Sequence, residues 1–418
     1  VQTCALPILA QHGTASPGQP TKQPWVIPVL MGLLGHDGRE LLPQQLLVLD
    51  QTGQTFTFEG IDATPVPSLL RGFSAPVVLD DGLTDAELLV LLAHDSDPFN
   101  RWEAGQRLAL RRMLAALKEE APQPLDEPFV EAMRGVLRHP GLDAAFKELV
   151  LTLPGEGYVA EQLTEVDPPR IHAVREHMRL EMATRLHEDW ALAYEECAVV
   201  EGYQPTPLPA GRRALANLAL AMLCLHAVRS GNPVWPGRAY QRVKDAGNMT
   251  ERLGALAALV DSHAELAEPA LERFFAAAGG EALVIDKWFT VQAAAVDPLG
   301  DQAGRTFARV KALMHHPAYS LKNPNRARSL LFPLCNGNPA AFHRKDAAGY
   351  VFWAERLVEL DALNPQLAAR LARAMDKWSC LVEPYRSAAR EAVARVAARS
   401  ELSDDVKEVL GRALEAAQ

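Results

Sequence analysis

The sequence predicts a mainly α-helical protein, an irregular and curved array of antiparallel helix pairs preceded by a small, truncated β-sandwich piece. Three observations support this fold class. Ala, Leu, Glu and Arg are abundant in a chain of 418 residues, and these residues favour helices over strands. A hydrophobic fraction of 48% and a charged fraction of 22% are typical of a globular protein. Short alternating apolar segments occur before residue 80, and helical periodicity follows to the end of the chain.

The β piece is predicted from short apolar segments separated by turn residues. Residues 11–24 are rich in Gly, Ser, Thr, Gln and Pro and indicate a loop. Asp37-Gly38 supplies the backbone conformation of a tight hairpin turn. The expected strands are 25–30, 31–34, 46–49, 55–58 and 76–79. These are too few to close a sandwich, so the piece is expected to be truncated.

The first eight residues, VQTCALPI, look like the translation of a sequencing-library adapter. Residues 1–8 are therefore predicted to be an artefact, and the gene is expected to continue upstream. This leaves a partial β-sandwich domain over residues 9–80 and an all-helical domain over residues 81–418.

The helical domain begins with a recognisable start signal. Thr84 and Glu87 have the spacing of a capping box, in which each side chain satisfies an exposed amide of the first turn. Helices are expected from there to the end, and one long helix is expected over 171–194 and another over 364–378. No fixed repeat period is visible, so the array should be irregular, with a concave surface suited to binding.

Charge and cysteine usage exclude several classes of function. A net charge of −10 argues against binding to nucleic acid or to acidic membranes, since both need a basic face. The five Cys residues are far apart and form no CxxC pair, which indicates a reduced, cytoplasmic protein. The most apolar window, 214–228, is shorter than the roughly twenty residues of a membrane span and predicts a buried helix.

No catalytic motif is present in the sequence. His187-Glu188 begins like a zinc-peptidase helix, but Ala191 replaces the second histidine, so His187 is expected to be an ordinary helix residue. His315 and His316 are adjacent, so on a helix their side chains point in different directions and cannot bind one metal ion together. They are expected to lie at the end of a helix, just before Pro317. There is no GxSxG motif and no Gly-rich phosphate loop.

Two polar groups are candidates for binding. Arg326 and Arg328 are two residues apart in a helix, so at most one can face a given cavity, and a structural role for Arg328 is equally compatible with the pattern. Gln366 and Arg370 are four apart and share one helix face. That face either binds substrate or is an ordinary solvated surface.

Several stretches together resemble bacterial aminopeptidase N, a zinc metallopeptidase of the gluzincin class. The matching segments are FSAPVVL (73–79), FNRWEAGQ (99–106), GNMT (247–250), DKWF (286–289), NPNRARSL (323–330) and NPAAFH (338–343). The resemblance covers residues 9–418 in order and corresponds to the C-terminal part of that family. It implies a small β domain followed by a helical domain that caps the active site.

The resemblance implies a division of labour between this chain and an absent N-terminal catalytic domain, which is its expected partner. Zinc would be bound in that absent domain, so this chain is expected to bind no metal, to contain no catalytic residue and to be inactive alone. Arg328, Gln366 and Arg370 would bind the peptide substrate, whereas Arg326 would be structural. The alternative is a stand-alone helical-repeat scaffold that binds a protein partner.

Overall fold

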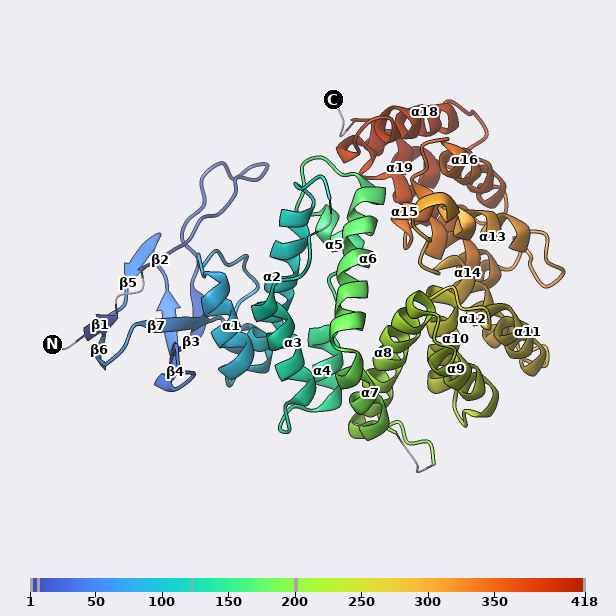
Figure 1. Ribbon diagram of the computed structural model, residues 1–418. Coiled ribbons are helices and arrows are strands. Elements are labelled where there is room, and N and C mark those ends of the chain that lie inside the picture. The colour runs from blue at the N-terminus through green and yellow to red at the C-terminus, as the bar shows by residue number, and fades with distance from the viewer. Residues whose placement is uncertain (1–2, 6–7, 122, 199–201, 416–418) are drawn as a thin grey trace. The chain divides into compact units, whose positions relative to one another are not determined.

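The computed structural model describes residues 3–5, 8–121, 123–198 and 202–415 (Figure 1). The chain forms two compact units. The first unit contains Val1–Arg112 and Leu125–Leu153, and the second contains Met113–Pro124 and Pro154–Gln418.

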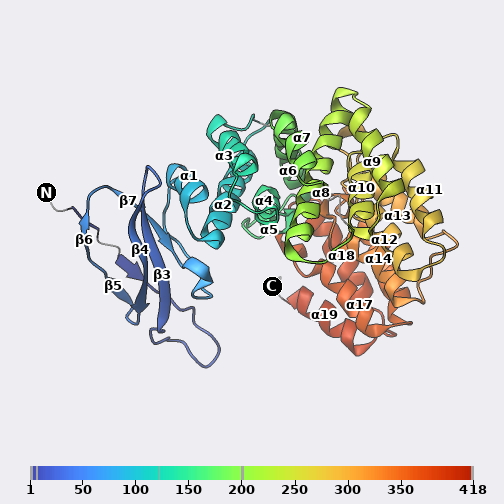
Figure 2. The ribbon, with the colours of Figure 1, turned by 90° about the horizontal axis from the view of Figure 1, so that it is seen from below.

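The described residues of the first unit form three small antiparallel sheets, whose orders are β1-β6, β2-β5 and β4-β3-β7 (Figure 2). The strands are β1 (Thr3–Ala5), β2 (Ile8–Ala10), β3 (Ile27–Gly35), β4 (Glu40–Leu49), β5 (Gly53–Thr55), β6 (Phe58–Ile61) and β7 (Pro65–Leu69). One face of the three-stranded sheet buries alternate residues of β3 and β4, among them Val29, Met31 and Leu47, against Phe58 and Ile61. This period of two is what the pleat of a strand requires.

The artefact predicted over residues 1–8 lies partly outside the described residues, which omit 1–2 and 6–7. In the described part of this segment, Thr3 pairs with Ile61 and Ile8 pairs with Thr55. Whether the segment is native stays a prediction.

The hairpin turn between β3 and β4 is confirmed. Gly38 has φ of 82° and the Gly35 amide donates to the Arg39 carbonyl at 2.8 Å. A glycine tolerates this left-handed conformation because it has no Cβ.

Three strand predictions need correction. The two strands expected over 25–34 form one continuous strand, β3, which pairs with β4 from Ile27 to Leu34 and with β7 from Met31 to Gly35. The strand expected over 55–58 is broken between Thr55 and Phe58, which belong to different sheets. Residues 76–79 form no strand, because the segment has no partner: the Val77 amide donates to the Ala75 carbonyl and Val78 is fully exposed.

Helix α1 (Asp85–His94) begins at the predicted capping box. The Thr84 hydroxyl accepts from the Glu87 amide at 3.3 Å, and the Glu87 carboxylate accepts from the Thr84 amide at 2.7 Å. The other helices of the first unit are α3 (Glu127–Arg138), α4 (Ala144–Leu151) and most of α2 (Pro98–Ala116).

The second unit is an array of helices in which each packs on its neighbours (Figure 1). Its first helices are α5 (Glu156–Ala160), α6 (Pro168–Arg185), α7 (His187–Glu196), α8 (Pro207–Ser230), α9 (Val234–Asp245), α10 (Met249–Asp261) and α11 (Ala267–Ala277). The array continues with α12 (Ala282–Ala293), α13 (Arg305–Leu313), α14 (Pro324–Cys335), α15 (Pro339–Phe342), α16 (Ala348–Asp361), α17 (Pro365–Ala372), α18 (Tyr385–Ala397) and α19 (Asp404–Glu415). The predicted α-helical class is confirmed.

The helix predicted over 171–194 is two helices, α6 and α7, separated at Leu186. Leu186 has φ of −109° and ψ of 22° and is fully buried. The indole of Trp190 donates to the Met182 carbonyl at 3.1 Å, so a side chain satisfies an acceptor at the end of α6. The Met182 carbonyl also accepts from the Leu186 amide at 3.1 Å, so this helix end is held by a backbone bond and a side-chain bond at a position where the sequence contains no Pro or Gly.

The helix predicted over 364–378 is also shorter than expected. Helix α17 ends at Ala372 and is followed by 3₁₀ turns at Arg373–Met375 and Trp378–Cys380. The indole of Trp353, from α16, donates to the Leu371 carbonyl at 3.0 Å. This bond satisfies a carbonyl near the helix end, so the helix can stop without leaving a buried acceptor unpaired.

The apolar window 214–228 lies in α8. By length and composition α8 could cross a membrane, but 56% of its apolar window is buried inside the protein. Core helices of soluble proteins pass the same test, so this helix is weak evidence for a membrane span.

The array of the second unit turns back on itself, so that its beginning meets residues near its end. The Val166 amide donates to the Cys380 carbonyl at 2.7 Å, and the Val382 amide donates to the Val166 carbonyl at 2.9 Å. Helix α15 also packs against α6. We call this meeting of residues 156–171 with residues 339–382 the seam.

Candidate functional site

The structure places Arg326 and Arg328 on different sides of α14. Asn323 caps this helix by accepting from the Asn325 and Arg326 amides. The guanidinium of Arg326 is buried, with Nε 3.1 Å from Asp286 Oδ1 and the group lying over the Phe289 ring at 5.2 Å. Arg328 is exposed and donates to Asn325 Oδ1 at 2.6 Å.

Gln366 and Arg370 lie on the exposed face of α17. Asn364 caps the helix by accepting from the Leu367 amide at 3.0 Å, and Leu367, Ala368 and Leu371 bury the opposite face. Within the described residues, neither Gln366 nor Arg370 forms a hydrogen bond or an ion pair with the rest of the chain. Both side chains are therefore available to an outside group.

Helices α14 and α17 pack against one another, so the structure brings the helix that carries Arg328 next to the helix that carries Gln366 and Arg370. All three side chains are exposed. The geometry thus provides two cationic groups and one amide on the surface of two contacting helices, without assigning them a ligand.

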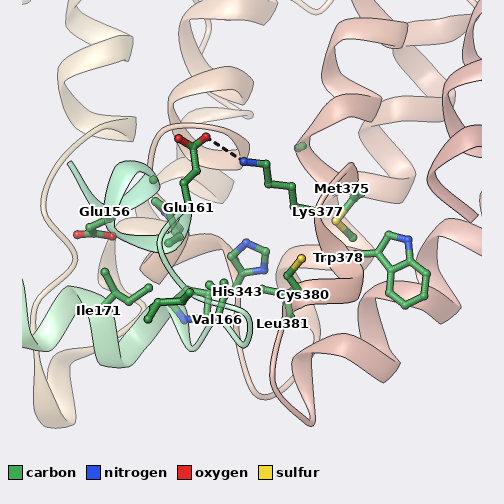
Figure 3. A pocket seen from close by; sticks show the side chains of 16 residues that line it. Glu156, Glu161, Val166, Ile171, His343, Met375, Lys377, Trp378, Cys380 and Leu381 are labelled. Atoms are coloured by element: carbon green, nitrogen blue, oxygen red, sulfur yellow. Dashed lines mark hydrogen bonds and ion pairs between the residues drawn. The ribbon is translucent and has the colours of Figure 1, made fainter. Parts of the chain in front are cut away.

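A separate cavity of about 360 Å³ lies at the seam (Figure 3). One part of its wall comes from residues 156–171 of α5, α6 and the segment between them, and the other comes from Pro339, His343 and residues 374–381. The wall is largely apolar, with Leu163, Val166, Ile171, Met375, Trp378 and Leu381 among its residues.

The imidazole of His343 lies among these side chains, between those of residues 156–171 and those of residues 374–381 (Figure 3). Its Nδ1 forms a hydrogen bond with the Tyr350 hydroxyl at 2.9 Å. Burial lowers the pKa of His343 to about 4, so the ring is neutral at neutral pH. The Glu161 and Lys377 side chains pair at 2.9 Å, and both are more than half exposed.

A buried histidine, His172, contributes to the same region. Its Nδ1 lies 2.6 Å from Glu156 Oε1 and its Nε2 lies 2.7 Å from the Asp297 carbonyl oxygen. Burial alone would lower the pKa of His172, but the hydrogen bond and charge of Glu156 raise it above its ordinary value. Because both ring nitrogens face acceptors, only the imidazolium can donate to both.

The remaining histidines that the sequence singled out are in helices or at their ends. His187 is the first residue of α7, and its ring lies 4.5 Å from that of His226, centroid to centroid. His315 and His316 follow α13, which ends at Leu313. In the part of the chain that the structure describes, no group of three or more His, Cys, Asp or Glu side chains could hold a metal ion.

Sequence reasoning did not find the cavity. Its residues come from two segments that are far apart in the chain, and each is ordinary when considered locally. Cys380, for example, belongs to no CxxC pair or other motif, yet it is partly exposed and lines the cavity. The NPAAFH segment was the one available signal, because it ends at His343.

Two domain families match this chain. Residues 85–415 match a family described as a domain of unknown function (DUF3458_C) with ARM repeats. Residues 3–82 match a family described as a domain of unknown function (DUF3458) with an Ig-like fold. The helical array and the β piece are thus found in the predicted order.

Aminopeptidases N from three bacteria are similar to the chain. The protein from Caulobacter vibrioides is 37% identical over 387 residues, which cover 92% of this chain and 43% of the relative. The protein from Escherichia coli is 31% identical over 416 residues, covering 97% of this chain and 47% of the relative. The protein from Haemophilus influenzae is 32% identical over 386 residues. The chain therefore spans less than half the length of these relatives and matches their C-terminal part.

A solved structure has the same fold. The crystal structure of Legionella pneumophila aminopeptidase A in complex with aspartic acid superposes with a TM-score of 0.81 at 27% identity, covering 93% of this chain and 45% of that one. These matches confirm the resemblance to bacterial aminopeptidase N. The chain belongs to the DUF3458_C family of helical ARM-repeat domains, here preceded by its Ig-like companion domain, and is similar to the C-terminal part of aminopeptidases N.

Proposed function

We propose that this chain is the helical cap and substrate-chamber wall of an aminopeptidase that removes N-terminal residues from peptides. The observation that supports the proposal is similarity to aminopeptidases N over 92% to 97% of the chain. More than half of each relative lies outside the match, and we assign the reacting groups to that unmatched part.

Zinc is the cofactor that we propose for the complete enzyme. A catalytic zinc needs three protein ligands, and the described residues of this chain offer no cluster of that size. The described part of the chain therefore does not fit the metal, and we assign no catalytic step to its residues.

The part that we assign to this chain is to hold the leaving side of the peptide. Arg370 and Gln366 are unpaired within the described residues and share one face of α17, and Arg328 lies on the neighbouring α14. A guanidinium can donate two parallel hydrogen bonds to a carboxylate or bind a backbone carbonyl. Such a contact would fix the position of the peptide without taking part in the chemistry.

We further propose a cytoplasmic location, with no nucleic-acid or membrane partner. The net charge of −10 and the cysteines without disulfides, seen at Cys197, Cys224, Cys335 and Cys380, support this proposal.

A chimera tests the proposal. The C-terminal part of the Caulobacter aminopeptidase N is replaced by this chain, and hydrolysis of alanine p-nitroanilide is measured with and without a chelator. We expect the chimera to be active and chelator-sensitive, and this chain alone to be inactive. Chelator-sensitive hydrolysis by the chain alone would contradict the proposal, and a folded but inactive chimera would favour a protein-binding scaffold.

The substrate contact is tested in the active chimera with Arg370→Ala. Loss of a hydrogen bond to a charged group should lower kcat/KM for a hexapeptide by about tenfold to a hundredfold, with little change for alanine p-nitroanilide. Arg373→Ala is the matched control, because Arg373 is also an exposed arginine close to Arg370 in sequence. Its guanidinium lies 3.8 Å from the Asp376 carboxylate, so it already has a partner within the chain. Equal losses on both substrates would remove the assigned contact.

A further inference from the structure

The cavity at the seam is a partly open, mostly apolar space to which neither the sequence nor the similarity to aminopeptidases assigns a role. We propose that it is a binding site for a small, uncharged aromatic molecule that carries one hydrogen-bonding group, and that this molecule links the two parts of the seam. The proposal does not depend on the peptidase function.

The size and lining of the cavity define the apolar part of the ligand. Its volume of about 360 Å³ lies at the lower end of the range for ligand pockets, roughly 300 to 1,000 Å³. A dry cavity of about 150 Å³ is enough for benzene, so two fused rings fit in this one. Aliphatic walls from Val166, Ile171 and Leu381, with Trp378 beside them, suit the faces of an aromatic ring.

The charges around the cavity exclude an ionised ligand. Glu161 and Lys377 neutralise each other, and Glu156 is paired with His172. The imidazole of His343 is neutral. Each charged lining side chain already has a counter-charge, so an ionised ligand would lose its hydration without gaining one. Glu156 Oε2 is a buried oxygen without a hydrogen-bond partner among the described residues, and it can only accept, so it favours a ligand with a donor group.

His343 supplies the polar contact. Its Nδ1 is occupied by the Tyr350 hydroxyl, which leaves Nε2 as the ring nitrogen able to bond a ligand. A neutral imidazole can donate or accept at Nε2, depending on its tautomer, so a hydroxyl group, which can do both, is the matching partner. One such bond among apolar walls is the usual pattern of a small-molecule site.

The position of the cavity gives the ligand a structural effect. Its walls come from the two segments of the seam, residues 156–171 and 339–382, and the hydrogen bonds of Val166 with Cys380 and Val382 join these segments directly. A molecule that contacts both walls binds only where the two segments lie together. Its binding should therefore stabilise the folded arrangement of the seam.

The test uses the whole chain and three naphthalene probes: 2-naphthol, naphthalene and 2-naphthoate. Binding is measured by calorimetry, and the thermal midpoint is measured with and without each probe. We expect 2-naphthol to bind roughly two- to tenfold more tightly than naphthalene, because a single hydrogen bond contributes about that much to affinity. We also expect 2-naphthol to raise the Tm of the chain. We expect 2-naphthoate to bind most weakly, and binding of 2-naphthoate as tight as that of 2-naphthol would overturn the proposal.

A filled cavity is the second arm of the test. Ala160 lines the cavity, so Ala160→Leu should abolish 2-naphthol binding. Ala354→Leu is the matched control, because Ala354 is also partly buried on a helix but lines a different groove, between α16 and α18. Unchanged binding in a folded Ala160→Leu variant, or equal loss in both variants, would refute the site. If Ala160→Leu does not fold, the probe series alone decides.

Discussion

The substitution Arg326→Met should lower the free energy of unfolding of the second unit by about 3 kcal/mol, because it leaves the largely buried Asp286 carboxylate without its cation. Arg326 is 6% exposed, and its Nε lies 3.1 Å from Asp286 Oδ1. Removing one partner of a buried pair costs about 3 to 5 kcal/mol. The Asp286 side chain keeps 15% of its surface exposed, so it retains some hydration and the lower figure applies.

Urea unfolding followed by Trp fluorescence measures this loss, since Trp190, Trp235, Trp288, Trp353 and Trp378 all lie in the second unit. For a unit of this size, the loss corresponds to a drop in Tm of roughly 6 °C. The double variant Arg326→Met with Asp286→Asn should recover part of the stability, because no uncompensated charge remains.

Arg328→Met is the control for this prediction. Arg328 is exposed and two residues away in the same helix, so its loss should change stability by no more than about 0.5 kcal/mol. Similar losses for both arginines, or a loss below about 1 kcal/mol for Arg326→Met, would refute the assignment of a buried ion pair.

Three further predictions concern a cap, a turn and a buried histidine. Thr84→Ala removes the hydroxyl that caps α1 and should destabilise the first unit by about 1 kcal/mol in urea unfolding. Gly38→Ala should be destabilising in the same assay, because φ is 82° and a Cβ would lie 2.3 Å from the His94 ring; an unchanged midpoint would contradict this geometry. His172 has a raised pKa in the folded state, so its contribution to stability is complete below its unfolded pKa of about 6.5 and is lost as pH rises through the folded value. Unfolding midpoints measured over a pH series should fall with rising pH in the wild type and change less in His172→Gln. Identical pH profiles for the two proteins would contradict the assigned role of His172.

Local signals in the sequence predicted elements whose ends depend on their own residues. The capping box at Thr84 and the hairpin at Gly38 each act within a few residues, and each is present in the structure. Such features are readable because their hydrogen bonds are made with near neighbours.

Helix ends that accompany side-chain packing between helices could not be read in this way. The break at Leu186 and the end of α17 at Ala372 accompany indole hydrogen bonds from Trp190 and Trp353 to helix carbonyls. The strand predicted at 76–79 is absent because apolar composition does not provide a pairing partner.

The sequence by itself determined the class of the protein: helical periodicity and caps define the array, and the ordered segments from FSAPVVL to NPAAFH indicate the family. It also placed Gln366 and Arg370 on one helix face, because a spacing of four residues does this in any helix. The tertiary structure decided which polar groups are buried and which distant segments meet. Arg326 is buried and paired with Asp286. Residues from 156–171 and from 339–381 together line the cavity that contains His343. These outcomes depend on contacts between residues far apart in the chain, and no local pattern encodes them.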